Sequence, residues 1–88
     1  MPKVVVVHRI TKGKDHWLNS PKREEIFTPL GVTNIRTYVN PQDAAHVAVS
    51  MDVADLDAAV GSINSPAGAA AMDYDGVDAE SMVIFVEE

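Results

Sequence analysis

Three histidines are the side chains of this chain best suited to acid–base chemistry, because an imidazole changes its charge near neutral pH. His8 lies in a β-branched run, His16 follows that run, and His46 lies in a later apolar stretch. A tyrosine or arginine beside a histidine could stabilise the negative charge that develops on a reacting oxygen. Tyr38 and Arg36 are the candidates for that role.

The elements that must position these residues follow from apolar patterning and helix caps. Runs of β-branched and other apolar residues predict strands over 3–10, 33–39, 45–51 and 80–86. Ser20-Pro21 and Ser65-Pro66 each pair a capping residue with a proline suited to the first helical turn.

These caps predict one helix that ends near Pro29 and Gly31 and a short helix through Met72. Apolar residues spaced i, i+3, i+4 and i+7 predict a further helix over 52–63. The expected order is therefore strand, helix, strand, strand, helix, strand.

This order predicts an α+β fold of the ferredoxin-like βαββαβ kind, formed by one domain over residues 1–88. Right-handed crossovers and one hairpin give a four-stranded antiparallel sheet of order 4-1-3-2 with both helices on one face. The other face of the sheet is left uncovered, and a second copy of the chain could cover it. We therefore expect a homodimer.

The uncovered face is where the candidate residues are expected to meet. Pairing Val39 with Ala45 puts an apolar set under the helices, and the opposite face then pairs Tyr38 with His46, Arg36 with Ala48 and Asn34 with Ser50. The first strand ends beside the start of the third, so we expect His8, Tyr38 and His46 to converge as the catalytic residues. Expected substrate contacts around them are Trp17, Arg36, His16, Ser50 and Asn34.

Two alternatives stay open at this point. The four valines before His8 are apolar on both sides of the strand, so they do not define which face His8 occupies. Each candidate also has a structural interpretation, as a core residue or as part of a solvated surface.

Composition narrows the possible functions. The chain has 88 residues, a net charge of −6 and no cysteine, which excludes a disulfide framework and a thiolate nucleophile. All seven Lys and Arg lie in residues 1–40, and residues 41–88 hold ten acids and no basic residue. This balance favours neither nucleic-acid binding nor membrane binding. No apolar run approaches the roughly 20 residues of a membrane span, so we expect a cytoplasmic protein.

Motifs for metals, nucleotides and nucleophilic triads are not found. Only two histidines are expected to converge, without a carboxylate, so we predict no metal site. Asp52, Asp55 and Asp57 lack the glycine and distal glutamate of a calcium loop. Ser50 has no readable triad spacing, and the glycines form neither a Walker motif nor GxGxxG.

Several segments together resemble the dimeric α+β barrel superfamily, which includes antibiotic-biosynthesis-type monooxygenases, muconolactone isomerases and small cyclase-like proteins. The segments are VVVVHRI with a following aspartate and Trp17, then TPLGV at 28–32, TYVNPQD at 37–43 and INSPAGAAAMDYDGV at 63–77 followed by SMVIFVEE. The resemblance runs nearly end to end. It implies a two-fold dimer that encloses a barrel, a pocket for a small hydrophobic ligand, and chemistry that often needs neither metal nor organic cofactor.

Two branches of that superfamily fit less well. The haem-degrading branch places a histidine on its second helix, and residues 52–72 contain none. The quinone-forming branch uses Asn, Trp, Tyr and Arg; Asn34, Trp17, Tyr38 and Arg36 match these only as residue types. Pro21 also interrupts a first helix that is usually continuous in the superfamily, which is expected to open the mouth of the pocket.

Two functions follow from this reading. The first is a cofactor-independent monooxygenase, isomerase or cyclase that acts on a small hydrophobic carbonyl or aromatic compound by histidine acid–base chemistry. The second is a non-catalytic dimeric barrel that binds a small ligand or supports a partner, with structural histidines. A ligand-sensing regulator is the least favoured, since no DNA-binding segment is attached.

Overall fold

A computed structural model of the chain describes residues 2–88, and its centre is a four-stranded antiparallel sheet of order β2-β3-β1-β4. The strands are β1 (Lys3–Ile10), β2 (Thr33–Asn40), β3 (Asp43–Asp52) and β4 (Val77–Val86). β1 is central because its run of β-branched residues suits a strand with neighbours on both sides. This is the expected sheet order read from the other edge, so the ferredoxin-like fold is confirmed.

The helices are short, and each begins or ends at a residue with a clear local reason. They are α1 (Lys14–Asn19), α2 (Lys22–Phe27) with the 3₁₀ turn η1 (Thr28–Leu30), α3 (Leu56–Ile63) and α4 (Pro66–Asp75). The Ser65 hydroxyl accepts a hydrogen bond from the Gly68 N–H at 3.1 Å, as the Ser-Pro pattern predicts. α4 ends at Gly76, whose φ of 74° is the left-handed conformation that glycine adopts most readily.

Several predicted boundaries are wrong, including those of the third strand, which spans Asp43–Asp52 and not 45–51. The helix expected over 52–63 begins only at Leu56, because Asp55 is its N-cap and accepts a hydrogen bond from the Ala58 N–H at 3.1 Å. α4 continues past Met72 to Asp75. The last strand begins at Val77, where the strand pairs with the end of β1.

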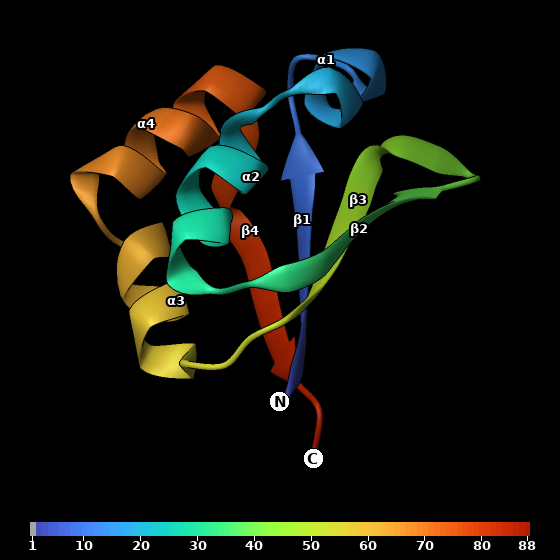
Figure 1. Cartoon of the computed structure of the whole chain (residues 1–88). Coiled ribbons are helices and arrows are strands. Elements are labelled where there is room, and N and C mark those ends of the chain that lie inside the picture. The colour runs from blue at the N-terminus through green and yellow to red at the C-terminus, as the bar shows by residue number, and fades with distance from the viewer. Residues whose placement is uncertain (1) are drawn as a thin grey trace.

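All of the helices lie on one side of the sheet, and the other side is uncovered (Figure 1). Along β1, Val4, Val6, His8 and Ile10 face the helices and are buried. Val47, Val49 and Met51 of β3 face the same way and form the core with them. The β2–β3 hairpin twists away from the helices, and the two chain ends lie near one another (Figure 1).

The register between β2 and β3 differs from the expected one by two residues. Val39 pairs with Val47 instead of Ala45, so Tyr38 lies opposite Ala48 and Arg36 opposite Ser50. The cause is a bulge: Asn40 pairs with Asp43, and three residues of β3 lie between this pair and the next. A shift of two residues keeps each side chain on its predicted face, because the side-chain period of a strand is also two.

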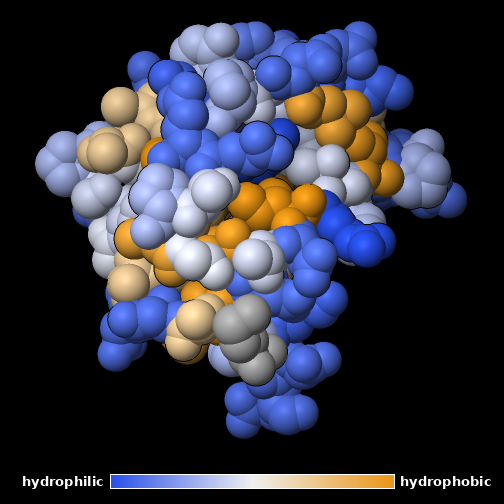
Figure 2. Space-filling model, in the orientation of Figure 1, coloured by the Kyte–Doolittle hydropathy of each residue, from blue (hydrophilic) through white to orange (hydrophobic). Residues whose placement is uncertain are grey.

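No helix formed by residues 2–88 has the length and apolar character needed to cross a membrane. The hydrophobic residues visible between the helices and the β2–β3 hairpin lie in the middle of a surface whose rim is largely hydrophilic (Figure 2).

Candidate active site

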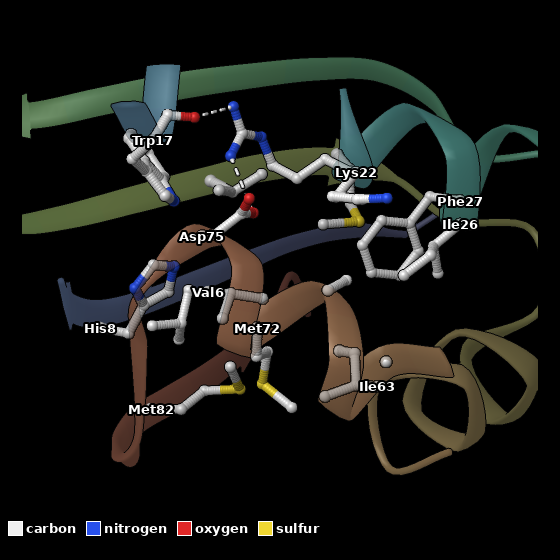
Figure 3. A pocket seen from close by; sticks show the side chains of 16 residues that line it. Val6, His8, Trp17, Lys22, Ile26, Phe27, Ile63, Met72, Asp75 and Met82 are labelled. Atoms are coloured by element: carbon white, nitrogen blue, oxygen red, sulfur yellow. Dashed lines mark hydrogen bonds and ion pairs between the residues drawn. The ribbon is translucent and has the colours of Figure 1, made fainter. Parts of the chain in front are cut away.

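A cavity of about 70 Å³ lies between the helices and the covered face of the sheet. Apolar side chains make most of its wall, and four polar side chains interrupt it: His8, Lys22, Arg23 and Asp75 (Figure 3). The apolar lining includes Val6, Trp17, Ile26, Phe27, Val49, Met51, Ile63, Met72 and Met82. An apolar pocket with a few convergent polar groups is the usual form of a small-molecule site.

His8 reaches this cavity from the centre of β1. Its ring lies edge-on to the Trp17 indole, with ring centroids 5.7 Å apart, and this packing limits its orientation. Burial lowers the pKa of His8, and the positive charge of Arg23 acts in the same direction, whereas the Arg9 carbonyl and Asp75 oppose them. His8 is therefore neutral at neutral pH and has a lone pair with which to accept a proton.

One ring nitrogen of His8 has a neighbour that suggests a tautomer. Nδ1 lies 3.4 Å from the Arg9 carbonyl oxygen, a contact in which a protonated Nδ1 donates. With the proton on Nδ1, Nε2 is the nitrogen that carries the lone pair.

Arg23 enters the cavity from the first turn of α2. Its Nη2 donates a hydrogen bond to the Trp17 carbonyl oxygen at 2.9 Å, and its guanidinium lies 4.6 Å from the centroid of the Trp17 ring. Burial lowers the pKa of Arg23, and the charge of Asp75 opposes this shift. The guanidinium keeps its charge, because arginine is not deprotonated in proteins at neutral pH.

Asp75 faces Arg23 from the last turn of α4. A carboxylate is unfavourable at a helix C-terminus, because the macrodipole is negative there, so this residue needs a cation nearby. Arg23 Nη1 lies 3.7 Å from Asp75 Oδ2, and the two side chains are only 12% and 5% exposed. This is a buried ion pair that joins α2 to α4 (Figure 3).

Two polar atoms of this pair are left without partners. Arg23 Nη1 and Asp75 Oδ1 are shielded from solvent and make no hydrogen bond within residues 2–88. A buried polar group without a partner costs about 1–3 kcal/mol, and more when it is charged. Such atoms at a cavity wall mark a place where a bound group could supply the missing bonds.

The expected convergence of His8 with His46 and Tyr38 is wrong. His8 pairs with Val47 and lies on the covered face, together with Trp17. His46 pairs with Arg9 and lies on the open face, since neighbouring residues of a strand point to opposite sides. The two histidines are at the same end of the sheet but are separated by the sheet itself.

Other predicted residues do meet on the open face. Tyr38 and His46 line an open hollow there with Val7 and Asn40. The Tyr38 and Ser50 hydroxyl oxygens are 2.9 Å apart and share a hydrogen bond.

The remaining predicted contacts lie elsewhere. Arg36 is exposed on β2, opposite Ser50. Asn34 has a φ of 54° where the β2–β3 register shifts, and its Nδ2 donates to Asp52 Oδ2 at 2.6 Å. His16 is exposed on α1, with Nε2 2.7 Å from the Tyr74 carbonyl oxygen. None of the three lines the cavity.

Sequence reasoning missed Arg23 and Asp75. Arg23 looked like one of several solvated basic residues, and nothing local distinguishes it. Asp75 does carry a signal, because an acid directly before the glycine that ends a helix is electrostatically unfavourable without a partner. The break between α1 and α2 at Ser20-Pro21 agrees with the expected interruption, and the cavity-lining Lys22 and Arg23 follow it directly.

Metal ligands are sparse in this part of the molecule. Across residues 2–88, no three His, Asp or Glu side chains gather closely enough to hold a metal ion. The cavity supplies one imidazole and one carboxylate, whereas catalytic zinc sites use three protein ligands.

Comparison with known proteins gives structural likeness without sequence likeness. The sequence matches no protein-family model and no curated protein. A crystal structure of an antibiotic biosynthesis monooxygenase is similar with a TM-score of 0.65 and 14% identity, covering 100% of this chain and 97% of that one. A Bordetella bronchiseptica protein assigned provisionally to the same group has a TM-score of 0.74 and 11% identity, covering 99% and 94%.

A third similar structure is described as a dimer. This protein of Bacteroides fragilis NCTC 9343, of unknown function and ferredoxin-like fold, has a TM-score of 0.62 and 18% identity, covering 99% of this chain and 94% of its own. The resemblance expected from the sequence is thereby confirmed at the level of fold. This chain has a ferredoxin-like fold, and it shares that fold with structures described as antibiotic biosynthesis monooxygenases.

Proposed function

We propose that this protein is an enzyme of the monooxygenase, isomerase or cyclase kind that acts on a small hydrophobic carbonyl or aromatic compound. The observation that carries the proposal is the neutral, buried His8 on the wall of an apolar cavity that also holds the Arg23 guanidinium. The likeness in fold to structures named antibiotic biosynthesis monooxygenases supports the reaction class.

The first chemical step follows from these two residues. Neutral His8 accepts a proton from a substrate hydroxyl, or from the carbon next to a substrate carbonyl. The electron pair left behind resides on the substrate oxygen as a phenolate or enolate. Arg23 stabilises this negative charge in a cavity of low polarity, where such an interaction is stronger than in water.

The outcome then depends on what the anion meets. Return of the proton from His8 to a different carbon completes an isomerisation. Attack of the anion on an internal electrophilic carbon closes a ring, and reaction with dioxygen begins an oxygenation. This chemistry uses only the imidazole and the guanidinium of the cavity.

Proton abstraction can be tested without knowledge of the final product. Small aryl ketones and aromatic 1,3-diketones exchange their acidic C–H protons for deuterium in D₂O, and proton NMR records the rate. We expect the protein to accelerate this exchange, and His8→Gln to slow it by about 10²–10⁴-fold with an unchanged circular dichroism spectrum. Full activity of a folded His8→Gln variant would remove the proposed mechanism.

His46 provides the comparison between the two faces of the sheet. His46, Tyr38 and Ser50 remain candidates for chemistry at the open face, with Arg36 at its margin. Loss of exchange in His46→Gln, with His8→Gln unaffected, would move the active site to that face.

The second candidate function is a non-catalytic barrel that binds a small ligand. The apolar cavity favours it, because such a cavity serves binding as well as catalysis. In that case His8→Gln lowers ligand affinity or stability, and neither the wild type nor the variant accelerates exchange.

We also propose that the open sheet face forms a homodimer. Phe85 is 58% exposed and Val83 48% exposed, although both are large apolar residues of β4. They lie beside Val5 and Val7 of β1 on the open side of the sheet. A second copy would remove this apolar surface from water, and a similar structure of the same fold is described as dimeric.

A further inference from the structure

The Arg23–Asp75 pair has one unused donor and one unused acceptor side by side. Arg23 Nη1 and Asp75 Oδ1 find no hydrogen-bond partner in the part of the chain that the structure describes. The closest approach of the pair, 3.7 Å between Nη1 and Oδ2, is too long for a hydrogen bond. Both side chains line the cavity.

The neighbouring polar groups are engaged elsewhere. Arg23 Nη2 already donates to the Trp17 carbonyl oxygen at 2.9 Å. Lys22 Nζ lies 3.4 Å from Glu25 Oε2 and 5.1 Å from the centroid of the Tyr74 ring. The Arg23–Asp75 pair therefore offers a ligand one N–H donor and one carboxylate acceptor, on a wall that also holds the His8 ring.

We propose that Arg23 and Asp75 form a binding subsite for the hydroxyl group of a phenol or enol. One hydroxyl oxygen can accept a hydrogen bond from Arg23 Nη1 while its proton is donated to Asp75 Oδ1. The apolar wall around the pair contacts the carbon skeleton. This inference rests on the proposed function, since it concerns the same cavity, and it names the chemical class of the substrate.

Other groups fit the pair less well. A ligand carboxylate would accept from Arg23 but would give Asp75 Oδ1 no proton, so that oxygen would stay unpaired. An ether would also leave Asp75 Oδ1 unpaired, and rejection of analogues that leave a buried polar group unpaired is strong in enzyme sites. A carbonyl compound meets the requirement in its enol form, which carries a hydroxyl group. A hydroxyl satisfies both atoms at once.

Arg23 Nη1 and Asp75 Oδ1 are shielded from solvent, so a side chain of the cavity wall has to move before a ligand can reach them. Met72 and Met82 line the same cavity, and the unbranched methionine side chain changes rotamer readily. We infer that these two side chains move to admit the ring.

Direct binding measures this preference independently of turnover. Trp17 is the sole tryptophan of the chain and lines the cavity, so its indole N–H signal in NMR reports binding there. Phenol, anisole and benzoate serve as probes that differ in the one group presented to the pair. The wild type is expected to bind phenol at least about tenfold more tightly than anisole or benzoate, which corresponds to about 1.4 kcal/mol.

Two matched double variants measure how much the Arg23–Asp75 pair contributes to the binding preference. Arg23→Met with Asp75→Leu replaces both charges by apolar side chains, and Lys14→Met with Asp73→Leu makes the same changes at exposed positions of α1 and α4. We expect the first double variant to bind phenol and anisole equally, and the surface double variant to keep the wild-type preference.

Three outcomes would overturn the subsite: equal binding of phenol and anisole by the wild type, tightest binding of benzoate, or a phenol preference that survives in Arg23→Met with Asp75→Leu. The absence of any probe-induced change at Trp17 would also overturn it. A phenol preference without acceleration of deuterium exchange would retain the subsite and refute the proposed function. Deuterium exchange that depends on His8, without a preference for phenol, would support the proposed function and refute the subsite.

Discussion

The buried Arg23–Asp75 pair allows a quantitative test of the electrostatics of the cavity. Arg23→Met leaves the Asp75 carboxylate buried at a helix C-terminus with no cation beside it. Arg23→Met combined with Asp75→Leu removes both charges and keeps similar side-chain volumes. We expect the single variant to be strongly destabilised and the double variant to be at least as stable as the wild type.

The magnitude follows from the geometry. Two unit charges 3.7 Å apart attract by about 4.5 kcal/mol at an effective dielectric constant of about 20. Burial costs several kcal/mol for each ion, so the intact pair contributes little net stability. Removing one partner leaves that burial cost uncompensated, and Arg23→Met is expected to lower the free energy of unfolding by about 3–5 kcal/mol.

The double variant loses two favourable contacts and also removes two unfavourable buried groups. It gives up the hydrogen bond from Arg23 to the Trp17 carbonyl and the cation–π contact with the Trp17 ring, about 1 kcal/mol each. The Trp17 carbonyl still accepts from the Ser20 N–H at 3.3 Å. Removal of two buried polar atoms without partners returns about 1–3 kcal/mol each, so the double variant should be at least as stable as the wild type.

Urea unfolding followed by far-ultraviolet circular dichroism measures these differences. All variants are compared at one protein concentration, because dimerisation couples stability to concentration. Lys14→Met with Asp73→Leu is the surface control and should change the free energy of unfolding by no more than about 0.5 kcal/mol. A loss below about 1 kcal/mol in Arg23→Met, or a double variant as unstable as the sum of its singles, would refute the reasoning.

Three further predictions concern other parts of the molecule. Burial lowers the pKa of His8, so the unfolded chain binds more protons than the folded one just below about pH 6.5. The free energy of unfolding should therefore fall as the pH drops through that window. Urea titrations of His8→Gln should lack this part of the pH dependence. Gly68→Ala should lower the free energy of unfolding by about 1–3 kcal/mol, because the added β-carbon would overlap backbone carbonyl oxygens at the end of α3. The β-carbon added by Gly61→Ala meets open space, so this variant should not destabilise the protein. Thermal melts compare the two variants. Phe85→Glu should convert the proposed homodimer to a monomer, as measured by sedimentation velocity, and the control Leu18→Glu should not. A wild-type protein that sediments as a monomer would contradict the proposed dimer.

Local sequence signals predicted most of the fold. The β-branched run over 3–10 can only be a strand of this length, and it forms β1 with those bounds. The Ser65-Pro66 cap and the glycine at 76 act through their own backbone and side chain, so α4 begins and ends where these residues require. The alternation of β2 and β3 also placed Tyr38 and His46 on the open face, because an even shift of register preserves the face.

The candidate site depended on the tertiary structure. Four consecutive valines carry no alternation, so only packing against the helices decides that His8 points into the cavity and away from His46. The bulge in β3 reflects the pairing of two strands and has no signature in either strand alone.

The Arg23–Asp75 pair is the clearest case of this division. Its members are far apart in the sequence, on α2 and α4, and each looks like an ordinary surface charge in its own segment. The chain by itself determined which elements form and in what order, because helix caps, turn glycines and β-branched runs act over a few residues. Only the packing of those elements brought the imidazole, guanidinium and carboxylate to one cavity, because burial and charge pairing arise between distant segments.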